Sequence, residues 1–244
     1  MVCSFNKLSF QFDSNLTTYM KYYVITLIQK FRFIFSYIFQ KGFSEIKFLN
    51  SIITDNSIVL DVGSNVGSFI ETVIKANKNV YVYSIEPDEN LINHQIKKFQ
   101  NLKNISYSNI AIDSKNGEAT FYLRNPASHS SLLQDHPDSS FNKIISSINI
   151  PVKTIENFIS SQQIDRVKLL KIDVEGLDYD ILVSLKNLLI NKKVDFVKIE
   201  ANRDSIEKII SFAFSNNLKI VGISSMFYFK NKLNMVDVYF ENEN

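Results

Sequence analysis

Two glycines and a glutamate have the types and spacing needed to bind a nucleoside. Gly63 and Gly67 follow an apolar run, residues 58–62, and open an amphipathic segment. A strand that passes through a glycine turn into a helix presents free N–H groups that can hold a carboxylate. Glu86 ends the next apolar run, roughly 20 residues after the first glycine, where a carboxylate accepts hydrogen bonds from both ribose hydroxyls.

The glycine spacing indicates which nucleoside fits. The dinucleotide fingerprint is G-x-G-x-x-G, and its middle glycine makes room for a pyrophosphate. Here the spacing is G-x-x-x-G, with Asn65 inside it. This favours a ligand with one ribose and an amino-acid tail, which is the form of S-adenosylmethionine. Two alternatives stay open: a nicotinamide-dependent oxidoreductase, and glycines that serve only the packing of a helix on a strand.

The elements that must position these residues alternate along the chain. From residue 58 onward, short β-branched runs alternate with amphipathic segments, the pattern of an α/β fold with a mostly parallel sheet. The pattern predicts seven strands, over residues 58–62, 80–86, 105–109, 167–172, 194–200, 218–223 and 234–240. It predicts helices over residues 66–76, 88–100, 178–189 and 204–215.

The end of the chain predicts a different connection. Residues 226–229 and 235–240 are separated by a short polar turn, so they must pair antiparallel, because no crossover helix fits between them. A parallel sheet that ends in an antiparallel hairpin is typical of methyltransferase domains rather than nicotinamide-binding domains. Earlier in the chain, residues 124–147 contain two prolines and two of the three His, and they predict a polar substrate loop or lid.

Several blocks together resemble the FkbM family of methyltransferases. The resemblance spans residues 58–200, and its most specific block is Lys171-Ile-Asp-Val-Glu-Gly176. The other blocks are Leu60-Asp-Val-Gly-Ser-Asn-Val-Gly67, Ser84-Ile-Glu-Pro87, Asn109-Ile-Ala111, Gly117-Glu-Ala119 and Thr154-Ile155. Ser64 stands where the family often has Ala, and Glu156 stands where an Asp is usual.

The resemblance implies a Rossmann-like class I methyltransferase fold with S-adenosylmethionine as methyl donor. It also implies O-methylation of a hydroxyl on a sugar, a polysaccharide precursor or a similar polar small molecule. The residues that it assigns to the methionine end of the donor are Asp61, Gly63, Asn65 and Gly67. It assigns Glu86 to the ribose, and Asn109 to Ala111 to the flanks of the adenine.

Methyl transfer to a hydroxyl needs in-line alignment and a group that takes the proton late in the transfer. We expect Asp173 to take it, because Asp173 ends an apolar strand at the open edge of the sheet. The alternative is that Asp173 orients the cofactor or caps the following helix. Glu175 either holds the acceptor hydroxyl or fixes Lys171, and Asp178 is expected to cap a helix.

Two further residues lie where they can contact the acceptor. His129 falls in the expected loop, and it is either a base whose titration controls activity or a solvated surface residue. Glu200 ends a neighbouring strand at the same edge of the sheet. A divalent cation would need Asp173, Glu200 and a third group, and Glu175 is the only acid closely spaced with Asp173, so we expect no metal.

Composition narrows the class of partner. The 244-residue chain is 45% hydrophobic with a net charge of +2, and it lacks the clustered Lys and Arg that bind nucleic acid. The single Cys excludes an internal disulfide and indicates a reducing, cytoplasmic setting. We therefore expect a small-molecule or glycan acceptor and no nucleic acid. A non-catalytic binding protein that keeps the fold is a further alternative, although all the expected cofactor groups are present.

The pattern divides the chain into a helical extension, residues 1–50, and a methyltransferase domain, residues 51–244. Within the extension, residues 19–43 are rich in aromatic and aliphatic side chains but are interrupted by four Lys or Arg. A membrane-spanning helix needs about 20 predominantly apolar residues. We therefore expect this segment to pack on the domain or to form a dimer contact, with peripheral membrane contact as the alternative.

Overall fold

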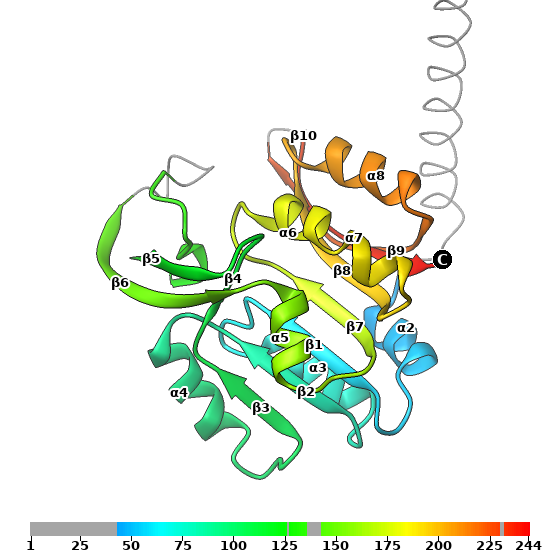
Figure 1. Cartoon of the computed structure of the whole chain (residues 1–244), viewed down its shortest axis with the longest axis horizontal. Coiled ribbons are helices and arrows are strands. Elements are labelled where there is room, and N and C mark those ends of the chain that lie inside the picture. Colours follow the sequence, from blue (N-terminus) through cyan, green and yellow to red (C-terminus); the bar gives the residue numbers. More distant parts are fainter. Residues whose placement is uncertain (1–42, 126, 136–142, 230–231) are drawn as a thin grey trace, which may run out of the picture. The chain divides into compact units, whose positions relative to one another are not determined.

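The computed structural model describes residues 43–125, 127–135, 143–229 and 232–244 (Figure 1). Seven segments pair into one sheet, here called the main sheet. The strands are β1 (Ile58–Val62), β2 (Tyr81–Ile85), β3 (Ile105–Ser108), β7 (Val167–Ile172), β8 (Val194–Asn202), β9 (Leu218–Phe229) and β10 (Lys232–Asn242). Their order across the sheet is β3-β2-β1-β7-β8-β10-β9. The seven expected strands are confirmed, with shifts at their ends.

The direction in which successive strands are added to the sheet reverses at β1: β2 and β3 lie on one side of it, and β7 and β8 on the other. Strand β1 pairs in parallel with both β2 and β7, and β8 continues the parallel set beyond β7. A crevice opens outside the carboxyl ends of parallel strands at such a reversal. Strand β10 pairs antiparallel with both β8 and β9, so the expected antiparallel hairpin at the end of the chain is confirmed.

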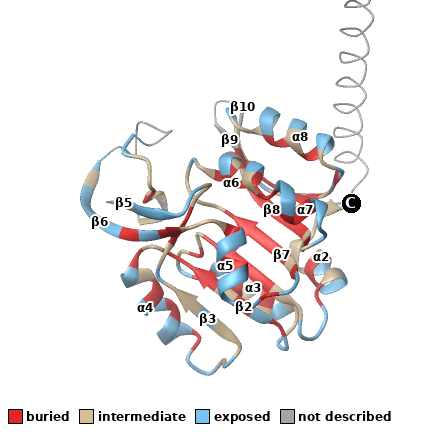
Figure 2. Ribbon diagram, in the orientation of Figure 1, coloured by how far each residue is buried: buried red, intermediate tan, exposed pale blue. Residues whose placement is uncertain are grey.

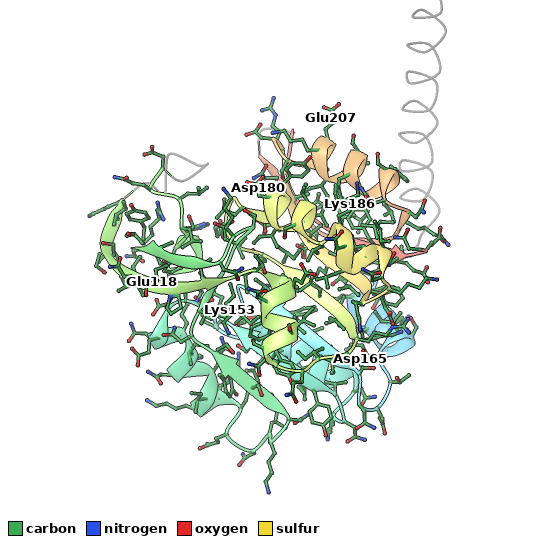
Figure 3. The ribbon with its side chains drawn as sticks, in the orientation of Figure 1. Glu118, Lys153, Asp165, Asp180, Lys186 and Glu207 are labelled. Atoms are coloured by element: carbon green, nitrogen blue, oxygen red, sulfur yellow. The ribbon has the colours of Figure 1, made fainter. Side chains whose placement is uncertain are left out.

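Helices cover both faces of the main sheet. They are α2 (Glu45–Ile52), α3 (Ser68–Ala76), α4 (Glu89–Lys98), α5 (Ile155–Ser161), α6 (Asp178–Ser184), α7 (Lys186–Ile190) and α8 (Ile206–Ser215). Helices α2 and α3 pack with Val59, Leu169 and Phe196 on one face, and α5 to α8 pack on the other. Figure 2 shows the buried strands between the exposed sides of these helices. Charged side chains such as Asp180 and Glu207 lie on those exposed sides (Figure 3).

A second sheet, here called the small sheet, was not expected as a unit. Its strands are β4 (Ala111–Ile112), β5 (Gly117–Arg124) and β6 (Ile144–Lys153), in the order β4-β6-β5. The prediction of an irregular segment over residues 124–147 is wrong at its end, because Ile144 already pairs with Arg124. The serines of β6 give it a polar composition, but Ile150 and Val152 alternate into a core with Phe121. Residues 126 and 136–142 lie outside the described residues.

Two boundaries also differ from the expected ones. The helix expected over residues 178–189 is divided at Leu185 into α6 and α7. The compact unit that holds both sheets runs over Ser44–Asn244, and α2 crosses the domain boundary expected at residue 50. Nearly all of the segment expected to make a dimer or membrane contact, residues 19–43, lies outside the described residues. None of the helices in the described part of the chain is long and apolar enough to cross a membrane.

Candidate functional site

A cavity of about 330 Å³ lies at the carboxyl ends of the central strands. Gly63 follows β1, Glu86 follows β2, Asp173 follows β7, and Glu200 lies in the last part of β8. All four residues line the cavity, although they are far apart in the sequence. Parallel strands that are adjacent at a reversal of the strand order bring such residues to one place.

The small sheet supplies another wall of this cavity. Phe121 of β5 lines it, together with His129 at the end of the short helix η1 (Ala127–His129) and the following Ser130 and Leu132. Sequence reasoning missed Phe121, Ser130 and Leu132 as lining residues. The only sequence signal near them was the polar segment over residues 124–147, which lies between two predicted regular blocks and was expected to form a substrate loop. Its role as a substrate loop stays a prediction.

The glycine turn is forced by two close approaches. Gly63 has φ +72°, and a Cβ added there would lie 1.7 Å from the backbone oxygen of Asp173. Gly67 has φ +76°, and its Cβ would lie 2.6 Å from a ring carbon of Phe99. Gly63 therefore allows the turn after β1 to contact the turn after β7. Gly67 allows the start of α3 to pack against Phe99 at the end of α4. Between the two glycines, Asn65 lines the cavity at φ +49°, a conformation that Asn tolerates.

The Glu86 carboxylate is bound by the backbone of two loops, the glycine turn after β1 and the loop between β2 and α4. Its Oε2 accepts from the Asn65 N–H at 2.8 Å, and its Oε1 accepts from the Asp88 N–H at 3.0 Å. The side chain is buried, and burial raises its pKa to about 7 although the two N–H groups lower it. Each carboxylate oxygen can accept a second hydrogen bond. The carboxylate is thus held in place with acceptor capacity left over.

Gln95 of α4 fixes the glycine turn through hydrogen bonds to Ser64 and Asn65. The sequence had not indicated this role. The Gln95 amide nitrogen donates to Ser64 Oγ at 2.9 Å and to the Asn65 carbonyl oxygen at 2.6 Å. Its amide oxygen accepts from Ser84 Oγ at 2.6 Å, and the side chain is fully buried. This network gives Ser64, which departs from the common family residue, a structural role.

We expect Gln95→Met to lower the free energy of unfolding by about 2–3 kcal/mol, because buried polar groups lose their partners. Urea unfolding followed by circular dichroism measures this loss. Asn93→Met is the matched control, since Asn93 lies on the same helix but is exposed. Equal midpoints for the two variants would contradict the assigned role of Gln95.

Three residues assigned by resemblance to the cofactor lie outside the described cavity lining. Asp61 is fully buried and forms an ion pair with Lys171 at 3.1 Å, and Gly67 packs against Phe99. Asn109 donates its side-chain amide to the carbonyl oxygens of Glu86 and Pro87. The other two residues assigned to the adenine end, Ile110 and Ala111, do line the cavity.

Carboxylates gather at the end of the cavity away from Glu86. Asp173, Glu175 and Glu200 line it together with His129, whose Nδ1 lies 3.6 Å from Glu175 Oε2. Burial, followed by the nearby charge of Asp173, raises the pKa of Glu175 to about 8 and that of Glu200 to about 9. The described residues contain no group of three His, Cys, Asp or Glu side chains that could hold a metal ion. Freedom from metal stays a prediction.

The loop that carries Glu175 is folded by Asp178. The Asp178 carboxylate accepts from the N–H groups of Val174 and Gly176, at 3.0 and 3.1 Å. Glu175 itself has φ +56°, a conformation that is strained for a residue with a long side chain. The expected capping role of Asp178 is wrong, because Asp178 is the first residue of α6 and bonds backward to this loop. Its effect is to hold Glu175 in the cavity wall.

The sequence that forms this site matches the model of a known protein family. The family model described as the methyltransferase FkbM domain matches residues 61–218, which is more than half of the chain. The chain belongs to the FkbM methyltransferase family. The cavity lining named above falls almost entirely within the matched FkbM domain. No curated protein matches the chain.

Solved structures similar to this chain include methyltransferases that share little sequence identity with it. A human methyltransferase 10 domain containing protein has a TM-score of 0.50 and 9% identity, with 82% of this chain and 80% of that chain covered. An rRNA methylase from Streptococcus thermophilus has a TM-score of 0.49 and 11% identity, covering 81% and 93%. TrmK from M. capricolum, in complex with S-adenosyl-homocysteine, has a TM-score of 0.48 and 14% identity, covering 82% and 69%. The strand order of the main sheet, the family match and the structure with the TM-score of 0.50 confirm the expected Rossmann-like class I methyltransferase fold.

Proposed function

We propose that this chain transfers a methyl group from S-adenosylmethionine to a hydroxyl of an uncharged polar acceptor, such as a sugar or a polysaccharide precursor. The observation that carries the proposal is that Glu86 and Asp173 line one cavity from opposite sides of the glycine turn. A donor with one ribose and one reactive centre spans such a site. Membership in the FkbM family supports this assignment.

The residues present fit the donor. Glu86 would accept hydrogen bonds from the ribose hydroxyls, as its fixed carboxylate has free acceptor capacity. Ala111 and Leu91 line the cavity near Glu86 and offer an apolar surface for an adenine. Gly63 and Asn65 of the turn line the cavity, where they would contact the methionine end.

The donor supplies an electrophilic methyl group on a sulfonium. The chain must align the acceptor oxygen with it and remove the hydroxyl proton. We assign proton removal to Asp173, with Glu175 and His129 beside it to hold the acceptor hydroxyl. A raised pKa keeps Glu175 protonated near neutrality, so its carboxyl group can both donate and accept a hydrogen bond.

The charge of the cavity favours an uncharged acceptor. Four of the described lining residues are carboxylates, namely Glu86, Asp173, Glu175 and Glu200, and none is Lys or Arg. A phosphate would find no Lys or Arg to pair with in this lining, whereas a sugar hydroxyl finds carboxyl groups that donate or accept a hydrogen bond. This supports a glycan or small molecule over nucleic acid, although one of the similar structures named above is an rRNA methylase. A cytoplasmic location belongs to the same proposal.

Ligand-induced thermal shifts test the donor. S-adenosylhomocysteine at about 100 times its Kd is expected to raise Tm by about 5–10 °C, because a ligand that binds only the folded state stabilises it. NAD at the same concentration is expected to leave Tm unchanged. A shift with NAD alone would favour the oxidoreductase alternative and remove the proposal.

Release of S-adenosylhomocysteine tests the acceptor class. Methyl glycosides are expected to support turnover, and sugar phosphates and an RNA oligonucleotide are not. Asp173→Ala is expected to reduce turnover at least about 100-fold, the usual scale of positioned proton transfer. If the protein binds the donor but Asp173→Ala and Glu86→Ala both leave the measured transfer unchanged, that transfer does not come from this site, and a non-catalytic binding protein is favoured.

A further inference from the structure

A row of charged side chains crosses the main sheet on the face covered by α2 and α3. Asp61 of β1 is the register partner of Lys171 of β7, which is the register partner of Lys198 of β8. Both lysines are buried, and both lie near the ring of Phe69 from α3, at 6.0 Å for Lys171 and 4.8 Å for Lys198. A buried ammonium is retained only where carboxylates or carbonyls compensate it.

The two lysines have different partners. Lys171 Nζ lies 3.1 Å from Asp61 Oδ1 and 3.2 Å from Asp173 Oδ2, and it donates to the carbonyl oxygen of Gly63 at 3.0 Å. Lys198 instead pairs with Glu45 and Asp237, each at 3.0 Å, and neither of these lines the cavity. Of the pair, only Lys171 therefore contacts the glycine turn and a carboxylate of the cavity.

We propose that Lys171 is a positioning residue that holds the Asp173 carboxylate at the place of the transferred methyl group. The proposal rests on the proposed function, since it assigns that place to Asp173. Asp61 lies beneath the cavity as the fixed partner of the ammonium, and Gly63 receives the third contact. One side chain thereby ties the β1 turn to the β7 carboxylate on the other side of the methyl position.

The exposed fractions of Asp61, Lys171 and Asp173 increase from the core of the sheet towards the cavity. The Asp61 side chain is 0% exposed, that of Lys171 is 8% exposed and that of Asp173 is 32% exposed. The row of charged groups thus runs from the buried Asp61 through Lys171 to Asp173 in the cavity wall. Burial disfavours the Lys171 ammonium, but the carboxylates of Asp173 and Asp61 outweigh burial and raise its pKa. Lys171 is therefore charged at neutral pH.

Two donor analogues separate the carboxylate at the methyl position from the rest of the site. Sinefungin carries an amine where the donor carries its methyl group, and S-adenosylhomocysteine carries nothing there. A carboxylate fixed at that place binds the amine, so we expect wild-type protein to prefer sinefungin by about tenfold or more in titration calorimetry. Asp173→Asn is expected to bring the two Kd values within about threefold of each other.

The decisive comparison is made in an Asp61→Asn background. This background avoids a buried unpaired carboxylate when the ammonium is removed, a change that strongly destabilises proteins. Asp61→Asn/Lys171→Met is expected to lose the sinefungin preference relative to Asp61→Asn, although Lys171 does not line the cavity. Lys171→Gln in the same background is a second variant with the same expectation. Adding Asp173→Asn to either is expected to cause no further loss, because both changes act on one carboxylate.

The chain offers a matched control. Asp237→Asn/Lys198→Met removes the neighbouring buried pair from the same face, and it is expected to leave the preference for sinefungin intact. A preference that survives removal of Lys171 but not of Asp173 would overturn the positioning role. A preference that survives Asp173→Asn would overturn it too. Failure of wild-type protein to bind S-adenosylhomocysteine at all would instead remove the proposed function itself.

Discussion

Glu86→Gln is expected to weaken the binding of S-adenosylhomocysteine by about 10–100-fold, the scale of hydrogen bonds to a charged group. In the wild-type protein the two carboxylate oxygens accept hydrogen bonds from the N–H groups of Asn65 and Asp88. In the variant, the amide NH2 faces one of these N–H groups and cannot accept its hydrogen bond. The turn loses a fixed contact and the ribose loses an ionised acceptor. Titration calorimetry at constant pH measures the change.

The matched control for this substitution is Glu89→Gln. Glu89 is the first residue of α4, is exposed and does not line the cavity, so affinity is expected to change less than about twofold. Equal losses for Glu86→Gln and Glu89→Gln would show that the ribose does not bind at Glu86.

Affinity is also expected to depend on pH through Glu86. Burial raises the pKa of Glu86 to about 7, and the ribose hydroxyls bind its ionised form. Affinity for S-adenosylhomocysteine therefore rises as pH increases through 7 and falls below it. Glu175 and Glu200 titrate at higher pH, so the informative quantity is the difference between wild type and Glu86→Gln. An identical pH profile for the two proteins would contradict the assignment.

Gly63→Ala is expected to lower the free energy of unfolding by more than about 4 kcal/mol, a loss outside the usual range for single substitutions. A Cβ at this position meets the backbone oxygen of Asp173 at 1.7 Å, so β1 and β7 must separate at the cavity. The positive φ of +72° adds strain for any residue with a side chain. Urea unfolding measures the loss, and binding of S-adenosylhomocysteine is expected to be lost with it.

Gly117→Ala distinguishes the clash from the backbone strain. Gly117 has φ +152°, but nothing lies within 4 Å of an added Cβ. Its loss is expected to be only about 1–3 kcal/mol, the cost of a strained backbone conformation alone. If both alanine variants lose the same stability, the contact between Gly63 and Asp173 is not what requires a glycine.

Most of the seven main strands could be predicted because they are local apolar runs, whereas β3 (Ile105–Ser108) alternates with serine and has no buried residue. Strands such as Ile58–Val62 and Val167–Ile172 are buried on both faces, and they therefore read as continuous hydrophobic segments. The small sheet could not be predicted in the same way. Three of the five exposed residues of β6 are serine or asparagine, and its buried apolar residues pack mainly against residues of β4 and β5.

The candidate site was predicted where residue type and strand end coincide. Glu86 and Asp173 each follow a main strand, and both line the cavity. Phe121 and Leu132 could not be placed, since their position depends on how the small sheet packs. Gly67 was predicted from its spacing, but its reason is the ring of Phe99, 32 residues further on by number, and no local pattern contains that contact.

The sequence by itself determined the fold class, the family and the strand ends at which the donor would bind, because those depend on periodicity and on residue type at short spacing. Only the tertiary structure decided that Asp61 belongs to a buried pair with Lys171 rather than to the described cavity wall. It also decided that Lys171 reaches both the Gly63 carbonyl and Asp173. Such contacts join residues distant in sequence, and they follow from strand order and register, which a local pattern does not specify.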